Sequence, residues 1–233
     1  MKNNMIDTFD ICKDCLFKSI CLQSMSKEDF DLLYESTIQK SYSKGDIIFK
    51  QDDKSLNLVF LQSGIVKFNF TDENNKNFIL TIVSAPSLLG LANILNEDIN
   101  IFSIVAIEDS MGCQLDLNKL KILAMNNKNF MINLSKLSTD MFRNSIYNVI
   151  SLAHKQINGR IADILLFLAR NVYHSNTFTL SISRQELAEY AGCSKENVIR
   201  SLRSLNRDNI IRVSGKEIEI LDLKKLIKIS KKG

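Results

Sequence analysis

Between Ile38 and Gln114 the sequence is a succession of short runs rich in β-branched and aromatic residues. The runs are DIIF, NLVFL, GIVKFNF, FILTIV and IFSIVAI, and turn signals such as Lys44-Gly45-Asp46 and Ser63-Gly64 separate them. Many short strands at near-regular spacing are typical of a β-barrel, sandwich or roll. We therefore expect a β-domain over residues 26–125, which is long enough to bury a core of its own.

The periodicity becomes helical from about Leu117 onward. Over residues 126–157 the pattern predicts a long helix in which apolar residues recur at spacings of four and three, namely Phe130, Leu134, Leu137 and Met141. A narrow apolar seam of this kind is typical of two helices that pair with each other. The same spacing also suits an ordinary amphipathic helix that packs on its own domain. The pattern favours a dimerisation helix and leaves that alternative open.

The stretch from Ser181 to Leu221 carries the strongest local signals. Ser183 and Glu186 form a capping box that begins a helix, and Gly192 ends it because the turn needs a residue that tolerates positive φ. Ser194 then caps a second helix, whose apolar face is Val198, Leu202 and Leu205. Two short helices around a glycine turn form a helix-turn-helix, and two strand-like runs follow as a wing. Residues 158–233 are therefore expected to be a winged helix-turn-helix domain.

The exposed face of the second helix presents groups suited to DNA. Glu196 and Arg200 lie one turn apart, and these residue types pair with cytosine N4 and with guanine O6 and N7. Ile199 lies beside them, in reach of a thymine methyl group. Four residues near helix N-termini are expected to bind phosphates, namely Ser183, Arg184, Ser194 and Lys195. For Glu196 and Arg200 alone, a plain surface salt bridge is the alternative interpretation.

Charge is distributed unevenly along the chain. Residues 150–233 hold 15 Lys and Arg against 8 Asp and Glu, whereas residues 1–149 hold 15 against 18. A basic C-terminal third suits a polyanion-binding module. Five of these charges would equally suit a solvated tail, namely Lys224, Lys225, Lys228, Lys231 and Lys232. Together with the capped helices and the wing, the basic field favours DNA binding.

The remaining composition argues against other classes of protein. The chain has 233 residues, 45% of them hydrophobic, with no run of about 18 apolar residues and no apolar secretory segment at its start. We therefore expect a cytoplasmic protein without a membrane span. The sequence offers no nucleophile–base arrangement, no Gly-rich phosphate loop and no set of metal-ligand histidines, so we do not expect an enzyme.

Three of the five cysteines, Cys12, Cys15 and Cys21, are clustered near the start, and Cys113 and Cys193 lie far from them. An odd number of cysteines without an export signal argues against a disulfide framework. Metal binding or redox chemistry is the better expectation for the clustered three, and a Cys-x2-Cys pair by itself would suit zinc or dithiol oxidation. Cys193 lies in the turn between the two helices, where we expect it only to pack.

The segment ISRQELAEYAGCSKENVIRSL resembles the helix-turn-helix of the CRP/FNR family of bacterial transcription regulators, and KGDIIFKQDD…LVFLQSGIVKF resembles the β-roll sensor domain of that family. The resemblance covers nearly the whole chain. It implies an α+β fold with an N-terminal β-roll of the cyclic-nucleotide-binding type, a long dimerisation helix and a C-terminal winged helix-turn-helix. It also implies a homodimer that recognises palindromic double-stranded DNA and has RNA polymerase as a partner.

Within the family, the cysteines resemble those of the FNR branch. Cys12-x2-Cys15-x5-Cys21, followed after 91 residues by Cys113 in AIEDSMGC, is similar to that branch's ligand set for a [4Fe–4S] cluster. Residues 1–25 would then be the cluster-binding segment, and four thiolates would hold the cluster. The resemblance implies an oxygen sensor whose intact cluster favours the dimer and DNA binding. The alternative inputs are a thiol–disulfide switch, a zinc switch or a small ligand in the β-roll.

Two features depart from the patterns of the family. Its cyclic-nucleotide receptors have Glu after a glycine and an Arg-Ser pair further on, whereas this chain has Gly90-Leu91 and Asn100-Ile101. Without a cation for the cyclic phosphate, cyclic AMP is not expected to bind. The FNR branch has Ser directly before the Arg that contacts bases, whereas this chain has Ile199. We therefore expect different outer bases in the half-site and a retained core GA step.

Overall fold

The computed structural model describes residues 26–94 and 99–232, and its N-terminal part is a β-roll. Two four-stranded antiparallel sheets form the roll, in the orders β1-β8-β3-β6 and β2-β7-β4-β5. Their strands are β1 (Ile38–Tyr42), β2 (Ile47–Phe49), β3 (Asn57–Ser63), β4 (Ile65–Thr71), β5 (Asn77–Ser84), β6 (Ser87–Leu89), β7 (Ser103–Ala106) and β8 (Ser110–Asp116). Apolar side chains from both sheets meet between them, including Val59, Phe68 and Ile104. The β-domain expected from the sequence is therefore confirmed.

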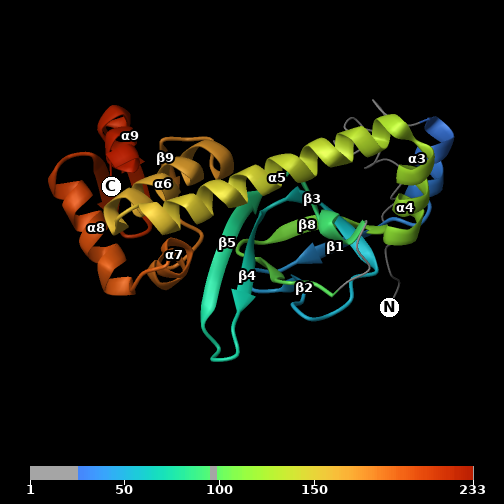
Figure 1. The fold of residues 1–233 in the computed structure, drawn as a ribbon, viewed down its shortest axis with the longest axis horizontal. Coiled ribbons are helices and arrows are strands. Elements are labelled where there is room, and N and C mark those ends of the chain that lie inside the picture. The colour runs from blue at the N-terminus through green and yellow to red at the C-terminus, as the bar shows by residue number, and fades with distance from the viewer. Residues whose placement is uncertain (1–25, 95–98, 233) are drawn as a thin grey trace, which may run out of the picture.

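Short helices cover one side of the roll and lead into the longest helix, α5 (Lys128–His154). They are α3 (Lys27–Tyr34), the 3-10 turn η1 (Leu91–Ile94) and α4 (Leu117–Asn126). Asn127 caps α5 by accepting from the Phe130 N–H at 3.0 Å. Figure 1 shows α5 running from the roll to the C-terminal domain. None of the described helices is long and apolar enough to cross a membrane.

The apolar seam predicted for α5 packs on the helix's own domain. Phe130 and Leu134 are buried, at 2% and 6% exposure, in one hydrophobic cluster with Leu58 and Leu115 of the roll. Met141 also packs partly against the roll. Phe130 and Leu134 therefore follow the alternative interpretation, in which the helix packs on its own domain, whereas Leu137 of the same seam is 39% exposed. Pairing of α5 with a second copy stays a prediction. A different row of apolar side chains on α5 is exposed, namely Ile132, Phe142, Ile146, Val149 and Ile150.

The C-terminal domain combines four helices with a three-stranded antiparallel sheet, β10-β11-β9. Its elements are α6 (Ile157–Phe167), the π-helical turn η2 (Leu168–Val172), β9 (Thr177–Thr179), α7 (Arg184–Ala191), α8 (Lys195–Arg207), β10 (Ile211–Ser214), β11 (Glu217–Ile220) and α9 (Leu223–Lys232). The terminal lysines belong to α9, which buries Leu226 against the domain. The described lysines of α9 are nevertheless exposed, so their charges are solvated on an ordered helix and the alternative interpretation of them stays open.

The roll and the C-terminal domain share one hydrophobic core. Ile79 and Ile82 of β5 lie in the same buried cluster as Leu165 of α6 and Leu187 of α7. Figure 1 shows β5 on the side of the roll that faces the C-terminal domain, next to α7. Because apolar burial is worth roughly 25 cal/mol per Å², this shared core holds the two domains in one arrangement.

Gly64 makes the tight connection between β3 and β4, and its backbone has a φ of 95°. A Cβ atom placed there would lie 2.1 Å from Ser110 Oγ and 2.7 Å from Ser110 Cα. Gly45 has a φ of 98° but no atom within 4 Å of such a Cβ. We expect Gly64→Ala to lower the free energy of unfolding by about 2–5 kcal/mol, from backbone strain and steric overlap together. Gly45→Ala should cost only the strain, about 1–3 kcal/mol. Denaturant unfolding of both variants tests this, and equal losses would contradict it.

Candidate nucleic-acid interface

The first helix of the expected helix-turn-helix begins and ends as its sequence predicts. The Ser183 hydroxyl of α7 accepts from the Glu186 N–H at 3.1 Å, and the Ser183 N–H donates to Glu186 Oε2 at 2.7 Å. This is the predicted capping box. Gly192 follows α7 with a φ of 58°, and a Cβ there would lie 3.0 Å from Leu152 of α5. The glycine therefore serves both the left-handed turn and the close approach of α5.

The second helix, α8, buries one face and exposes the other. Its N-cap Ser194 accepts from the Asn197 N–H at 3.3 Å. Val198, Leu202 and Leu205 are at most 3% exposed and pack into the core of the domain, as predicted. Figure 1 shows α8 at the end of the molecule farthest from the roll. On the opposite face of α8, Glu196, Arg200 and Arg203 are exposed.

The side chains expected to contact bases project from this accessible face. Glu196 and Arg200 are exposed, and Ile199 is half-buried. No ion pair joins Glu196 to Arg200 among the described contacts, and Arg200 instead donates to Asn197 Oδ1 at 3.1 Å. The backbone N–H of Glu196 and the hydroxyl of Ser194 lower the pKa of the Glu196 carboxyl. The positive charges of Lys195 and Arg200 lower this pKa further, so Glu196 is a charged acceptor at neutral pH.

Three of the four residues expected to bind phosphates are exposed, and the fourth is engaged within the domain. Ser183, Ser194 and Lys195 lie at the N-termini of α7 and α8. Arg184 is half-buried, and its guanidinium donates to the Gly215 carbonyl, at the tip of the wing, at 2.7 Å. Arg184 therefore fixes the wing against α7, a contact across 31 residues that the local sequence does not indicate.

An ion pair connects the roll directly to the first turn of α7. Lys67 Nζ of β4 lies 2.7 Å from Glu186 Oε1, and the two side chains are only 15% and 26% exposed. Burial raises the pKa of the Glu186 carboxyl, but hydrogen bonds from Lys67 and Ser183 outweigh it, so that its pKa lies below the ordinary value. Nearby, Lys44 donates to the Ser181 carbonyl at 3.0 Å, and the Ser181 hydroxyl donates to Glu108. The carboxylate that caps α7 thus also binds the roll.

A second polar cluster fixes the angle between α5 and α6. Asp163 of α6 accepts from Ser151 of α5 at 2.5 Å, from Lys155 of the connecting segment at 2.7 Å, and from Ser230 of α9. Arg160 donates to the carbonyl of Lys155 at 2.8 Å and to that of Gly192 at 3.3 Å. Side chains of α6 therefore link the end of α5 to both α9 and the helix-turn-helix.

The structure describes two of the five cysteines. Cys113 of β8 is 5% exposed, in the cluster that contains Leu33 of α3 and Phe130 of α5. Cys193 packs partly buried against the core of the C-terminal domain, where burial raises the pKa of its thiol. The other three predicted cluster ligands, Cys12, Cys15 and Cys21, lie outside the described residues. Within the described part, no three His, Cys, Asp or Glu residues are grouped to hold a metal ion.

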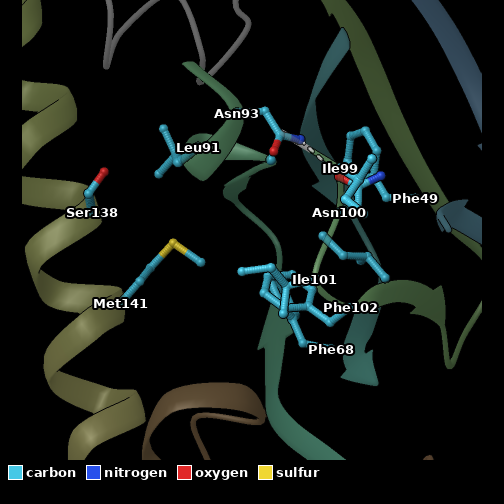
Figure 2. A pocket seen from close by; sticks show the side chains of 12 residues that line it. Phe49, Phe68, Leu91, Asn93, Ile99, Asn100, Ile101, Phe102, Ser138 and Met141 are labelled. Carbon is cyan, nitrogen blue, oxygen red and sulfur yellow. Dashed lines mark hydrogen bonds between the residues drawn. The ribbon is translucent and has the colours of Figure 1, made fainter. Parts of the chain in front are cut away.

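A cavity of about 230 Å³ lies between the roll and α5. Figure 2 shows Ser138 and Met141 of α5 on one side of it and the side chains of the roll on the other. Its lining is mainly apolar and includes Phe49, Phe68, Leu91, Ile101 and Phe102. None of the described lining residues is charged. The cavity therefore suits an apolar molecule better than an anion.

The residues that the sequence analysis compared with the phosphate-binding segment of cyclic-nucleotide receptors border this cavity, namely Gly90, Leu91, Asn100 and Ile101. Asn100 is buried and accepts from the Asn93 amide at 2.9 Å, while its own amide donates to the Lys50 carbonyl at 3.0 Å. Figure 2 marks the bond between the two amides. Ile101 is 72% exposed, and Leu91 lines the cavity. These residues supply no cation for a cyclic phosphate.

Three further residues, which the sequence analysis did not single out, support the helix-turn-helix or lie on the exposed face of α8. Lys67 and Asp163 carry no local signal, because their partners come from other elements; Lys67 pairs with a carboxylate 119 residues away. Arg207 lies eleven residues from Glu196 on the face of α8 where the helical repeat also places Arg203. The same repeat could have identified Arg207.

Two family models match the chain. Residues 39–127 match the cyclic nucleotide-binding domain, and residues 159–229 match the Crp-like helix-turn-helix domain. The first match covers the β-roll, and the second covers α6, α7, α8 and the wing.

Individual proteins are similar over most of the chain. The transcriptional activator protein Anr of Pseudomonas protegens is 30% identical over 220 residues, which are 91% of this chain and 88% of that protein. The cAMP-activated global transcriptional regulator CRP of Pasteurella multocida is 30% identical over 187 residues, 78% of this chain and 89% of that protein. The structure of FixK2 from Bradyrhizobium japonicum has a TM-score of 0.77 at 20% identity, over 83% of this chain and 96% of that one. These similarities confirm the expected fold class.

The ion pair between Lys67 and Glu186 is expected to contribute to stability in a pH-dependent way. Because the folded-state pKa of Glu186 is lowered, its contribution is present above the unfolded pKa of about 4.3 and is lost as pH falls through the folded pKa. Lys67→Met should lower the free energy of unfolding by about 1–3 kcal/mol at pH 7 and flatten its decline in acid. Denaturant unfolding between about pH 7 and pH 3 measures both effects. Lys76→Met, in the exposed β4–β5 turn, is the control. An acid dependence identical to the wild type would contradict the prediction.

Proposed function

The chain belongs to the CRP/FNR family of DNA-binding transcription regulators, and from that premise we propose a homodimer that binds palindromic DNA through α8 under the control of an iron–sulfur cluster. Proteins of this family are regulators and not enzymes. RNA polymerase is the further partner that regulation of transcription calls for.

The observation that carries the DNA-binding proposal is the accessible face of α8. Glu196 and Arg200 project from it without pairing to each other, so neither bond to a base has to break an ion pair first. An acceptor and a forked donor one turn apart suit adjacent cytosine and guanine edges in the major groove. Ser183, Ser194 and Lys195 then lie where helix N-termini would meet phosphates.

The exposed row of apolar side chains on α5 supports the homodimer. Phe142, Tyr147 and Val149 are each more than 60% exposed, and Ile146 and Ile150 are more than 40% exposed. Large apolar side chains gathered along one helix face mark an interaction surface. Residues 142, 146 and 149 follow one another at spacings of four and three, the spacing with which two helices pair. A second copy of the chain, pairing through α5, would cover this row and give the two-fold symmetry that a palindrome requires.

The surroundings of Cys113 support a cluster site beside the start of α5. Cys113 is buried in an apolar cluster that also holds Phe130 and Leu134 of α5. The helix α3 begins only six residues after Cys21, and its Leu33 packs in the same cluster. A short chain segment thus separates the clustered cysteines from the neighbourhood of Cys113.

These residues fit a [4Fe–4S] group. Four cysteines remain when Cys193 is set aside, and a cubane cluster takes four thiolates. The apolar side chains around Cys113 limit access of water and oxygen to it, and solvent exposure is one determinant of cluster chemistry. When bound, the cluster would supply an oxygen-sensitive group. The packed side chains of this chain would transmit a change at Cys113 to Phe130 and Leu134 of the dimer helix.

A small apolar ligand in the β-roll cavity is the second candidate for the input signal. The observation that favours it is the cavity of about 230 Å³ between the roll and Met141 of α5, since a ligand there would touch the dimer helix directly. The absence of a charged side chain among its described lining residues supports our proposal that cyclic AMP is not that ligand.

Arg200→Ala is expected to weaken binding to a TGA-containing palindrome about 5- to 150-fold, because one bidentate contact to guanine is worth about 1–3 kcal/mol. Selectivity over the same palindrome with that guanine replaced should fall in parallel. Fluorescence anisotropy with the palindrome and with a single half-site measures affinity, selectivity and the need for a dimer. Lys76→Ala, far from α8, is the matched control. Full affinity and selectivity in Arg200→Ala would refute the assignment of α8.

Anaerobic reconstitution with iron and sulfide is expected to load about four iron atoms per chain on the wild type and on Cys193→Ser, but not on Cys113→Ser. Exposure of the loaded wild type to air should then lower its affinity for the palindrome. Iron and sulfide analysis, followed by binding before and after air, tests the cluster. If the protein retained zinc instead of iron, the zinc switch would replace the cluster as the proposed input. If it formed a disulfide without loss of metal, the thiol–disulfide switch would replace it.

A further inference from the structure

A groove of about 340 Å³ lies where the roll, α5 and the C-terminal domain meet. We call it the junction groove. Its lining includes side chains from five elements, namely Thr81 of β5, Asn144 and Tyr147 of α5, Phe167 of α6, Arg170 of η2 and Tyr190 of α7. None of the functions derived so far uses it. A molecule bound there would contact both domains and the long helix at once.

The end of the groove nearest the connection between α5 and α6 is polar but carries no net charge. The Ser151 hydroxyl of α5 donates to Asp163 Oδ2 of α6 at 2.5 Å, and Lys155 Nζ lies 2.7 Å from the same oxygen. Ser230 of α9 donates to the other oxygen of this carboxylate. Both oxygens of Asp163 are therefore engaged, and Lys155 compensates their charge.

The far end of the groove carries one uncompensated positive charge. Arg170 lies seven residues after Asp163, which is about 10 Å along the helix. Asn144 lies seven residues before Ser151, so the two side chains line the groove at corresponding distances from its polar end. Within the described residues, the exposed Arg170 side chain makes no ion pair or hydrogen bond, and the amides of Asn144 and Asn171 make none either. The guanidinium and both amides are therefore available to an anionic ligand.

Between its two ends the groove has an apolar floor. Ile164 and Leu166 of α6 are 4% and 7% exposed. The ring of Phe167 lies edge-on to the buried ring of Tyr190, with the centroids 6.4 Å apart. Tyr147 of α5 adds a ring that is 62% exposed. Such a floor suits the aromatic or aliphatic body of a small molecule.

We propose that the junction groove binds a small organic monocarboxylate, with its carboxylate on Arg170 and its apolar body on the floor of the groove. A guanidinium matches a carboxylate through two parallel hydrogen bonds. Of the three charged residues among the described lining, Lys155 and Asp163 cancel, so the groove balances one negative charge. A phosphate ester, with close to two charges, would be balanced less well.

A bound carboxylate would also stabilise one arrangement of the two domains. It would touch Arg170 and Phe167 of the C-terminal domain and Asn144 of α5 together, so its affinity depends on how these elements are placed. The binding site itself does not depend on the proposed function, whereas an effect on DNA binding rests on it.

Titration calorimetry of the full chain with 3-phenylpropionate and with its neutral amide, 3-phenylpropionamide, tests the site. The carboxylate should bind about tenfold more tightly, because only it gains charged hydrogen bonds to the guanidinium. Arg170→Gln should lower the affinity for the carboxylate to that for the amide and leave the amide unchanged. Arg143→Gln, at an exposed arginine of α5 outside the groove, is the matched control and should bind as the wild type does. Asn144→Phe should weaken binding of both ligands, because the larger side chain occupies the groove.

Three results would overturn the proposal: no preference for the carboxylate over the amide, an equal loss in Arg143→Gln, or unchanged binding in Arg170→Gln and Asn144→Phe. The last of these would place the probe elsewhere, for example in the cavity between the roll and α5. Saturating 3-phenylpropionate should also change the affinity of the wild type for the palindrome about fivefold or more, and should have no effect on Arg170→Gln. Binding of the carboxylate without this change would refute its coupling to α8. If the wild type does not bind the palindrome with or without the carboxylate, the proposed function fails, and calorimetry still decides the groove.

Discussion

Ile79 and Ile82 of β5 belong to the same hydrophobic core as Leu165 of α6 and Leu187 of α7. The roll and the C-terminal domain are therefore packed against each other through one core in this structure. Because close-packed protein interiors do not deform continuously, a change in the roll has to shift the helix-turn-helix as a unit or leave it in place. The orientation of α8 thus depends on how β5 packs against α6 and α7.

Two polar contacts act together with the shared core in fixing the orientation of the DNA-binding domain. Lys67 binds the carboxylate that caps α7, and Asp163 joins α5, the segment after it and α9. Each contact has one partner in the DNA-binding domain and another in the roll or in α5. Partly buried charges of this kind are costly to leave unpaired, so both contacts favour one relative orientation over others that would bury the same apolar surface.

The long helix α5 has one face that packs against the roll and another that is exposed. Phe130 and Leu134 pack against the roll in the cluster that contains Cys113, while Phe142, Ile146 and Val149 are exposed along the helix. A signal at Cys113 and a partner chain would therefore act on α5 from different sides and at different positions along the helix. In the proposed function this helix connects the cluster site to the dimer, and through Ser151 and Asp163 it connects both to the orientation of α8.

The sequence by itself determined what depends on neighbours within a few residues. The Ser183–Glu186 capping box, the Ser194 cap, the left-handed Gly192 and five of the eight strands of the roll follow from hydrogen bonds and periodicities that span two to four positions. The strands β1, β6 and β8 were not among the predicted runs. The same local rules placed Glu196 and Arg200 on one exposed face. Only the tertiary structure decided which face of α5 the roll covers, because the apolar spacing of residues 130–141 suits either partner.

Contacts across the fold were likewise beyond the reach of the sequence. The sequence predicts Arg184 as a phosphate ligand, and only the fold shows that it also donates to the wing at Gly215. Lys67 and Glu186 meet across 119 residues, which no local pattern indicates. The physical reason is that a hydrogen bond or a helical repeat is fixed by covalent proximity, whereas the partner of an exposed charge or an apolar face depends on how separate elements pack. Many pairings satisfy the same sequence pattern, and the shared core selects one of them.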